Sequence, residues 1–146
     1  TMIARIANSG GFVSSYASSA EPQAGRGGFL NDWRANMAAA QPGSITGYGF
    51  GTDVNGLGNQ AAARSNAAQQ PLVYPFTALN GVTVQRETVG QRTYDLNTDG
   101  MANYGLLADW TADLVLAAGA DGPVIKKLLM SSAETYTSMW EAARAW

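Results

Sequence analysis

The chain has 146 residues, of which 46% are hydrophobic, and this is enough for one domain with a buried core. Only 14% are charged, below the roughly 25% of a typical soluble domain, so we expect a partner to cover part of the surface. The net charge of -2 and the scattered Lys and Arg argue against nucleic-acid binding. No apolar run reaches the roughly 18 residues of a membrane span, so we expect a soluble chain without one.

Two residue types that carry much of enzyme chemistry are missing: the sequence has no cysteine and no histidine. Disulfides, thiolate ligands and a cysteine nucleophile are therefore excluded. The commonest general base and metal ligand is also absent. We therefore expect that this chain is not a complete enzyme and that another polypeptide finishes its active site.

Residues 1–56 have the pattern of a βαβ unit. A short strand is predicted at 12–16, a helix at 29–40 with apolar residues at helical spacing, and a buried strand at 45–50. A strand, a helix and a second strand within about forty residues are typical of a parallel sheet. Sites in such sheets form at the carboxyl ends of the strands.

Residues 57–100 are interpreted as a loop and hairpin insertion. The stretch from 53 to 70 has no periodicity and is predicted to be a long loop. The runs 72–76 and 82–89 predict a β-hairpin, because Asn80-Gly81 between them supplies the positive φ angles of a tight turn.

Residues 101–146 are expected to be the terminal helices of a single segment that spans 1–146. Helices are predicted near 104–118, from Pro123 onward, and at 133–145. The last helix is expected to bury one stripe of side chains: Tyr136, Met139, Trp140 and Ala143.

Two groups of side chains are interpreted as structural. Aromatic residues on helical stripes, with one at the terminus, are more typical of packing than of ligand binding: Trp33, Trp110, Trp140 and Trp146. A second group is expected on a solvated surface: Arg64, Arg86, Glu87 and Arg92. As an alternative, an Arg on the long loop holds a substrate carboxylate through a bidentate contact.

Asp53 is the first candidate for chemistry. It follows the second predicted strand, where a carboxylate can bind a metal or take a proton from an attacking water. The alternative is that Asp53 caps a turn, because Asp, Asn and Gly are ordinary turn formers.

The sequence around Asp53 resembles a known family. Segment 47–57, Gly-Tyr-Gly-Phe-Gly-Thr-Asp-Val-Asn-Gly-Leu, resembles the strand-end motif Gly-Ser-Asp-Phe-Asp-Gly of the membrane-dipeptidase-like branch of the amidohydrolase superfamily. Segment 104–110, Tyr-Gly-Leu-Leu-Ala-Asp-Trp, followed by Leu114 and Gly119, is similar to that family's Gly-Leu-x-Asp stretch and the helix after it.

The resemblance implies an α/β fold, with this chain as the carboxy-terminal part of a (β/α)₈ TIM-type barrel that carries an inserted β-hairpin. It implies a metal-dependent hydrolase of amide, peptide or ester bonds, with zinc as the first expected metal. Another polypeptide would supply the N-terminal part of the barrel, and the substrate would be a small molecule or peptide-like.

The resemblance also implies roles for individual residues. Asp53 matches the catalytic or metal-bound aspartate after the last strand of the family. Asn55 and Gly56 follow it in the motif and, with Asn103, are the expected substrate-binding residues. Thr52 stands where the family has Ser, and Asn55 where it has Asp, which weakens a role for Asn55 as a metal ligand.

A second metal hypothesis comes from spacing. Asp95, Asn97 and Asp99 match the first half of a calcium loop, in which alternating oxygen ligands wrap the cation. The bidentate Glu of such loops is replaced by Leu106. The favoured alternative is an Asx-rich turn that leads into a helix.

Two further functions are kept as alternatives. Thr1 can act as an N-terminal nucleophile whose own amino group serves as the base, a mechanism that needs neither His nor Cys. Because Met2 follows it, the start of the chain is interpreted as a product of processing or as a chosen boundary. The other alternative is a non-catalytic assembly subunit that kept the fold.

Overall fold

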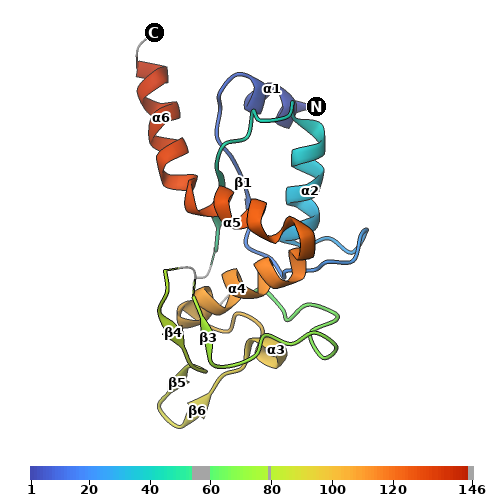
Figure 1. Cartoon of the computed structure of the whole chain (residues 1–146), viewed down its shortest axis with the longest axis vertical. Coiled ribbons are helices and arrows are strands. Elements are labelled where there is room, and N and C mark those ends of the chain that lie inside the picture. Colours follow the sequence, from blue (N-terminus) through green and yellow to red (C-terminus); the bar gives the residue numbers. More distant parts are fainter. Residues whose placement is uncertain (54–59, 79, 145–146) are drawn as a thin grey trace.

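The fold is that of a computed structural model, which describes residues 1–53, 60–78 and 80–144. Helices α1 and α2 lie at one end of the molecule, and the short strands β3 to β6 lie at the other (Figure 1). Helices α4 (Leu107–Ala118) and α5 (Gly122–Met130) lie between these two ends, and α6 (Ser132–Arg144) runs from α5 toward the end that holds α1.

The first half of the chain builds a small parallel sheet. Helix α1 (Met2–Asn8) leads into β1 (Val13–Tyr16), which pairs in parallel with β2 (Tyr48–Gly51). Helix α2 (Phe29–Ala39) connects the two strands and packs against β1. The strand, helix and strand that the sequence predicts in this region are therefore confirmed as elements.

Helix α2 is held in place by aromatic packing. Phe29 is fully buried, and its ring meets Tyr48 edge-on at 5.7 Å and Trp110 at 5.1 Å between centroids. Such edge-to-face pairs add about 0.5–1.5 kcal/mol to the burial of the rings. Because Tyr48 lies on β2 and Trp110 on α4, Phe29 joins the parallel sheet to the second half of the chain.

The two faces of the sheet have different surroundings. Val13 is 4% exposed on the face covered by α2, whereas Ser14 is exposed on the opposite face. That opposite face borders a hollow of about 420 Å³, whose lining includes Phe12, Ser14, Gly49, Gly51 and Tyr136. We call this side of the β1–β2 sheet the open face.

The insertion after the sheet contains two short hairpins. Strand β3 (Phe76–Thr77) pairs with β4 (Thr83–Val84), and β5 (Thr88–Val89) pairs with β6 (Arg92–Thr93). The prediction of one hairpin with strands at 72–76 and 82–89 is therefore wrong in its bounds. The run after the first turn divides because Thr88 and Val89 pair forward, across the turn at Gly90, where φ is +61°.

The described elements that follow β6 are all helical. The elements are α3 (Leu96–Asp99), a 3₁₀ turn (Tyr104–Leu106), α4 (Leu107–Ala118), a second 3₁₀ turn (Gly119–Asp121), α5 (Gly122–Met130) and α6 (Ser132–Arg144). Leu106, Trp110 and Leu114 bury the stripe predicted for the longer helix. Gly119, with φ at +59°, ends α4 as expected.

Helix α6 does not bury the stripe that its sequence predicts. Tyr136 and Trp140 are each 52% exposed, and no residue of α6 is fully buried. Phe12 touches Tyr136 edge-on at 5.6 Å, but the helix then extends away from the body of the molecule (Figure 1). The expectation of burial is wrong for Tyr136 and Trp140, because Phe12, which contacts Tyr136 and Met139, covers only part of this side of α6.

Among the described residues, no helix combines the length and the apolar character that crossing a membrane requires.

Candidate functional site

Asp53 lies at the carboxyl edge of the parallel sheet, where it follows β2 after Thr52. Its side chain is exposed, and its φ of 49° turns the chain out of the strand direction, a conformation that Asp adopts more readily than most residues. A Cβ added to Gly51 would lie 4.0 Å from Asp53 Oδ1. The carboxylate of Asp53 therefore lies next to the open face of the sheet.

The loops that leave the carboxyl ends of β1 and β2 are joined by Glu21, which is 5% exposed. Its Oε2 accepts a hydrogen bond from Ser65 N at 3.0 Å, and its Oε1 accepts one from Ser65 Oγ at 2.8 Å. Burial acts to raise the pKa of Glu21, but the hydrogen bonds from Ser65 and Gln23 outweigh it and hold the pKa below its usual value. An ionised carboxylate thus ties the two loops together.

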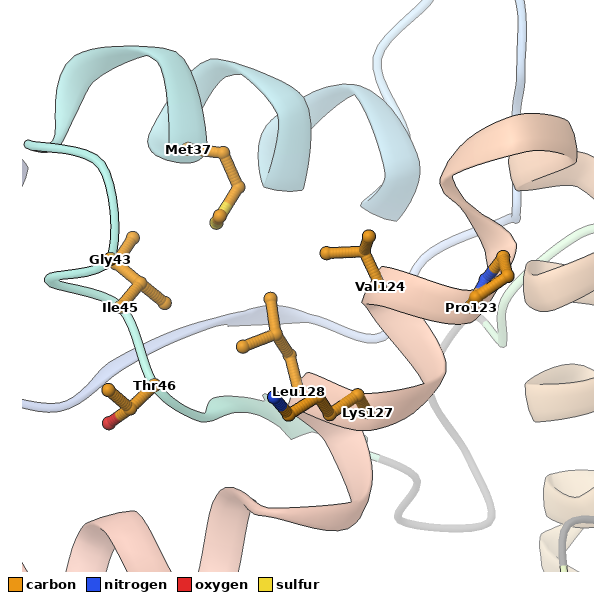
Figure 2. Close-up of a pocket in the computed structure, with 8 residues that line it drawn as sticks. All are labelled: Met37, Gly43, Ile45, Thr46, Pro123, Val124, Lys127 and Leu128. Atoms are coloured by element: carbon orange, nitrogen blue, oxygen red, sulfur yellow. The ribbon is translucent and has the colours of Figure 1, made fainter.

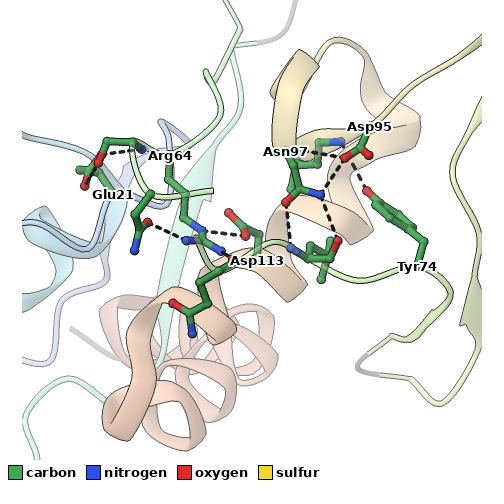
Figure 3. A network of polar contacts seen from close by, with 11 residues as sticks. Glu21, Arg64, Tyr74, Asp95, Asn97 and Asp113 are labelled. Atoms are coloured by element: carbon green, nitrogen blue, oxygen red, sulfur yellow. Dashed lines mark hydrogen bonds and ion pairs between the residues drawn. The ribbon is translucent and has the colours of Figure 1, made fainter. Parts of the chain in front are cut away.

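Arg64 anchors the same stretch of chain to α4. It is 3% exposed, and its Nε donates to Asp113 Oδ1 at 2.8 Å (Figure 3). It also donates to Asn66 Oδ1 at 2.6 Å and to the carbonyl oxygen of Gln70. The prediction that Arg64 lies on a solvated surface is therefore wrong, because Asp113 and the turn of 65–70 give the guanidinium partners inside the protein.

The other two arginines of that group do lie at the surface. The side chains of Arg86 and Arg92 are 48% and 63% exposed, and they pair with Asp95 and Asp99 respectively. Exposed pairs of this kind contribute about 0–1 kcal/mol each.

Asp109, the aspartate of segment 104–110, is a buried carboxylate to which the sequence assigns no role. It is 1% exposed and accepts a hydrogen bond from the hydroxyl of Tyr74. Burial raises the pKa of Asp109, and the hydrogen bond from Tyr74 offsets only part of this effect. The sequence contains a signal for its burial, since Asp109 and Asp113 are four residues apart in a mostly apolar helix and so share one side of it.

The three oxygen-bearing residues of the calcium hypothesis are occupied by the protein itself. Asp95 caps α3 by accepting from Asn97 N at 2.9 Å, and Asp95 N donates to Asp99 Oδ2 at 2.9 Å. The amide side chain of Asn97 exchanges two hydrogen bonds with the backbone of Leu72 (Figure 3). This geometry is that of an Asx-rich turn leading into a helix, the favoured alternative.

The remaining candidate residues either cap helices elsewhere in the molecule or fall outside the described residues. Asn103 Oδ1 accepts from Gly105 N at 2.7 Å and caps the 3₁₀ turn. Thr1 Oγ1 accepts from Ala4 N at 3.2 Å and caps α1, which precedes the amino end of β1, whereas Asp53 follows the carboxyl end of β2. Asn55 and Gly56 fall outside the described residues.

The described residues do not bring together enough ligands to hold a metal ion. Within residues 1–53, 60–78 and 80–144, no three acidic side chains lie together in a way that could hold one. Asp53 can supply one carboxylate from the edge of the sheet. Any further ligands would have to come from elsewhere.

A separate apolar groove lies at the opposite end of β2. Its volume is about 680 Å³, and it is bounded by Met37 of α2, by Ile45 before β2, and by Val124 and Leu128 of α5 (Figure 2). Because Ile45 precedes β2 and Asp53 follows it, the groove is not part of the carboxyl-edge site.

No protein-family model and no curated protein matches the sequence, and no solved structure matches the fold. The candidate site is therefore defined by this chain's own geometry: Asp53, the open face, and the loops joined by Glu21 and Ser65.

Proposed function

We propose that this chain forms the carboxy-terminal part of a (β/α)₈-type barrel in a metal-dependent hydrolase of amide, peptide or ester bonds. One observation carries the proposal: a parallel β1–β2 pair has an exposed carboxylate, that of Asp53, at its carboxyl edge and an open face beside it. The resemblance of segment 47–57 to a dipeptidase-like motif supports the same conclusion.

The sheet itself supports a larger assembly. Parallel sheets occur almost exclusively with both faces covered, and sheets usually contain more than two strands. Here α2 covers one face, while the other borders a hollow. Additional strands from another polypeptide would cover the open face and close the sheet into a barrel.

Asp53 has the position that chemistry at such a sheet requires. Active sites of α/β barrels lie at the carboxyl ends of the strands, where the loops converge. Glu21 and Ser65 join the two loops that leave those ends. Its carboxylate can accept a proton from an attacking water or serve as one ligand of a cation.

The chain by itself does not fit a complete metal site, because the described residues contain no acidic cluster and the sequence has no His or Cys. In this proposal the other polypeptide holds the metal, with zinc as the first candidate. The contribution of this chain to the reaction is limited to the Asp53 carboxylate and to the walls of the site.

The test compares Asp53→Asn with Asp121→Asn in the native assembly. Asp121 is also solvent-accessible, and it pairs with Arg34 away from the sheet edge, which makes it a matched control. We expect Asp53→Asn to lower kcat/KM for dipeptide and ester substrates by about 10²–10⁴-fold, because it removes a group that handles a proton. The thermal unfolding midpoint should not change, since Asp53 is exposed.

Three results would count against the proposal. Full activity of Asp53→Asn would remove Asp53 from the chemistry. An assembly that contains no divalent metal and hydrolyses no substrate would favour the non-catalytic assembly subunit. Loss of activity in Thr1→Ala with retention in Asp53→Asn would favour the N-terminal nucleophile instead.

A further inference from the structure

The hydrogen bonds of the parallel pair fix which backbone groups point outward. Ala17 N donates to Gly51 O at 2.9 Å, so the backbone N–H and C=O groups of Ala17 and Ser15 point toward β2. In a parallel ladder, alternate residues of a strand point to opposite sides. The N–H and C=O of Ser14 therefore point away from β2, along what we call the outer edge of β1.

At the start of this outer edge the backbone N–H of Phe12 already has a partner, whereas, within the part of the chain that the structure describes, the backbone groups of Ser14, the next residue that points outward, do not. Phe12 N, which points to the same side as Ser14, donates to the sulfur of Met139 on α6 at 3.2 Å. Among the described residues, no backbone group outside the β1–β2 ladder pairs with Ser14, and its side chain is exposed. A strand edge with unmade backbone hydrogen bonds is a template for another strand.

Apolar surface continues from this edge. The hollow over the open face reaches from Ser14 and Phe12 to Tyr136 on α6, and Trp140 lies one helical turn further along that helix. Tyr136 and Trp140 are each half exposed. A strand on the outer edge would place alternate side chains over this hollow, because neighbouring strands lie about 4.8 Å apart and side chains alternate between faces.

We propose that a β-strand of the polypeptide that completes the barrel adds in parallel to the outer edge of β1. It pairs with the N–H and C=O of Ser14, and its apolar side chains pack against Phe12 and Tyr136. The inference rests on the proposed function, because the parallel direction and the identity of the occupant follow from the barrel. It names the edge, the first pairing residue and the apolar contacts of that strand.

Amide hydrogen exchange tests the pairing directly. The probe is the Ser14 amide, measured in the 146-residue chain alone and in the assembly isolated with its native partner. We expect the Ser14 amide to exchange quickly in the chain alone and at least about 100-fold more slowly in the assembly, as expected for a buried strand hydrogen bond. The Ser15 amide, which faces β2, is the internal control and should be protected in both.

A matched pair of variants tests the hydrogen bond that the Ser14 N–H would donate to the added strand. Ser14→Pro deletes an outward N–H and spares the β1–β2 ladder, and edge strands tolerate proline. Ser14→Ala keeps the N–H and removes only the hydroxyl. We expect Ser14→Pro to weaken binding of the native partner at least about tenfold, the equivalent of one lost hydrogen bond, and Ser14→Ala to bind normally.

The outcomes separate this inference from the proposed function. A hydrolytically active assembly in which the Ser14 amide still exchanges quickly would overturn the strand addition and leave the hydrolase proposal standing. Protection of Ser14 in an assembly without metal or activity would support the strand addition and remove the hydrolase. Protection of Ser14 in a homodimer of this chain would replace the proposed occupant with a second copy.

Discussion

Glu21 is a buried carboxylate whose contribution to stability depends on pH. Hydrogen bonds from Ser65 and Gln23 favour its charged form and lower its pKa below 4.5 in the folded protein, although burial opposes this. A group whose pKa is depressed on folding stabilises the native state above its unfolded pKa. That contribution is lost as the pH falls through the folded pKa.

We expect Glu21→Gln to lower the free energy of unfolding at pH 7 by about 1–3 kcal/mol, because hydrogen bonds to a charged group are lost. Below pH 4.5 the difference between the variant and the native chain should shrink, because Glu21 is then protonated in the unfolded state but still ionised in the folded state, and it should disappear once the pH falls below the lower folded pKa. Urea denaturation between pH 3 and 7, with Glu134→Gln on the exposed surface of α6 as control, measures this. A difference that is constant with pH would contradict it.

Arg64 shows why the burial of a side chain cannot be inferred from its residue type alone. An Arg in a Gly- and Ala-rich loop is expected in solvent, yet Arg64 is buried with Asp113 as its partner. The two residues are far apart in the sequence, and nothing local signals the pairing. Removing one member of such a buried pair typically costs about 3–5 kcal/mol, because the other charge is left unpaired.

Among the elements, α4 and α6 each have an apolar stripe, but α4 is the more apolar helix overall and the two lie in different surroundings. Trp110 on α4 is 2% exposed, and its Nε1 donates to Ser18 O at 2.8 Å. Trp140 on α6 is 52% exposed and has Arg144 over its ring at 4.9 Å. The tryptophan of the predicted stripe is thus buried on α4 and half exposed on α6.

We expect Trp110→Ala to cost about 3–5 kcal/mol of unfolding free energy, the usual cost of emptying an aromatic core position. Trp140→Ala should cost less than about 1 kcal/mol in the chain alone, because little more than a cation–π contact is lost. Urea denaturation of both variants measures the difference. Equal costs would contradict the exposure of Trp140 and mean that its ring is packed as tightly as that of Trp110.

The sequence predicts those features that depend on nearby residues, and it fails for those that depend on contacts with distant segments of the chain. The strands and helix of the βαβ region follow from local apolar patterns, and they are present as β1, α2 and β2. The position of Asp53 after β2 follows from the same patterns. The burial of Arg64 and the exposure of Trp140 could not be predicted, because each depends on what packs against the residue from a distant segment.

For the molecule as a whole, the same long-range contacts decide which loops are accessible. Arg26 and Arg64 both lie in segments without regular secondary structure that follow a strand of the parallel sheet. Arg26 is exposed, whereas Arg64 is held by Asp113 and Asn66. A protease that requires an accessible arginine therefore distinguishes the two loops.

We expect trypsin under native conditions to cut after Arg26 at least about tenfold faster than after Arg64, because cleavage at Arg64 first requires local unfolding. Mass spectrometry of the earliest fragments measures the order of the cuts. Simultaneous cleavage at both sites would show that the anchor between Arg64 and α4 opens readily in solution.

The link between Phe12 and Met139 also has a consequence for the order of folding. The sheet pairs Val13 with Tyr48 inside the first third of the chain, so both of its strands are synthesised before α6. Met139 is synthesised after both strands of the sheet. The outer edge of β1 is therefore fully exposed early, and a neighbouring strand has its widest access to that edge before synthesis of α6 is complete.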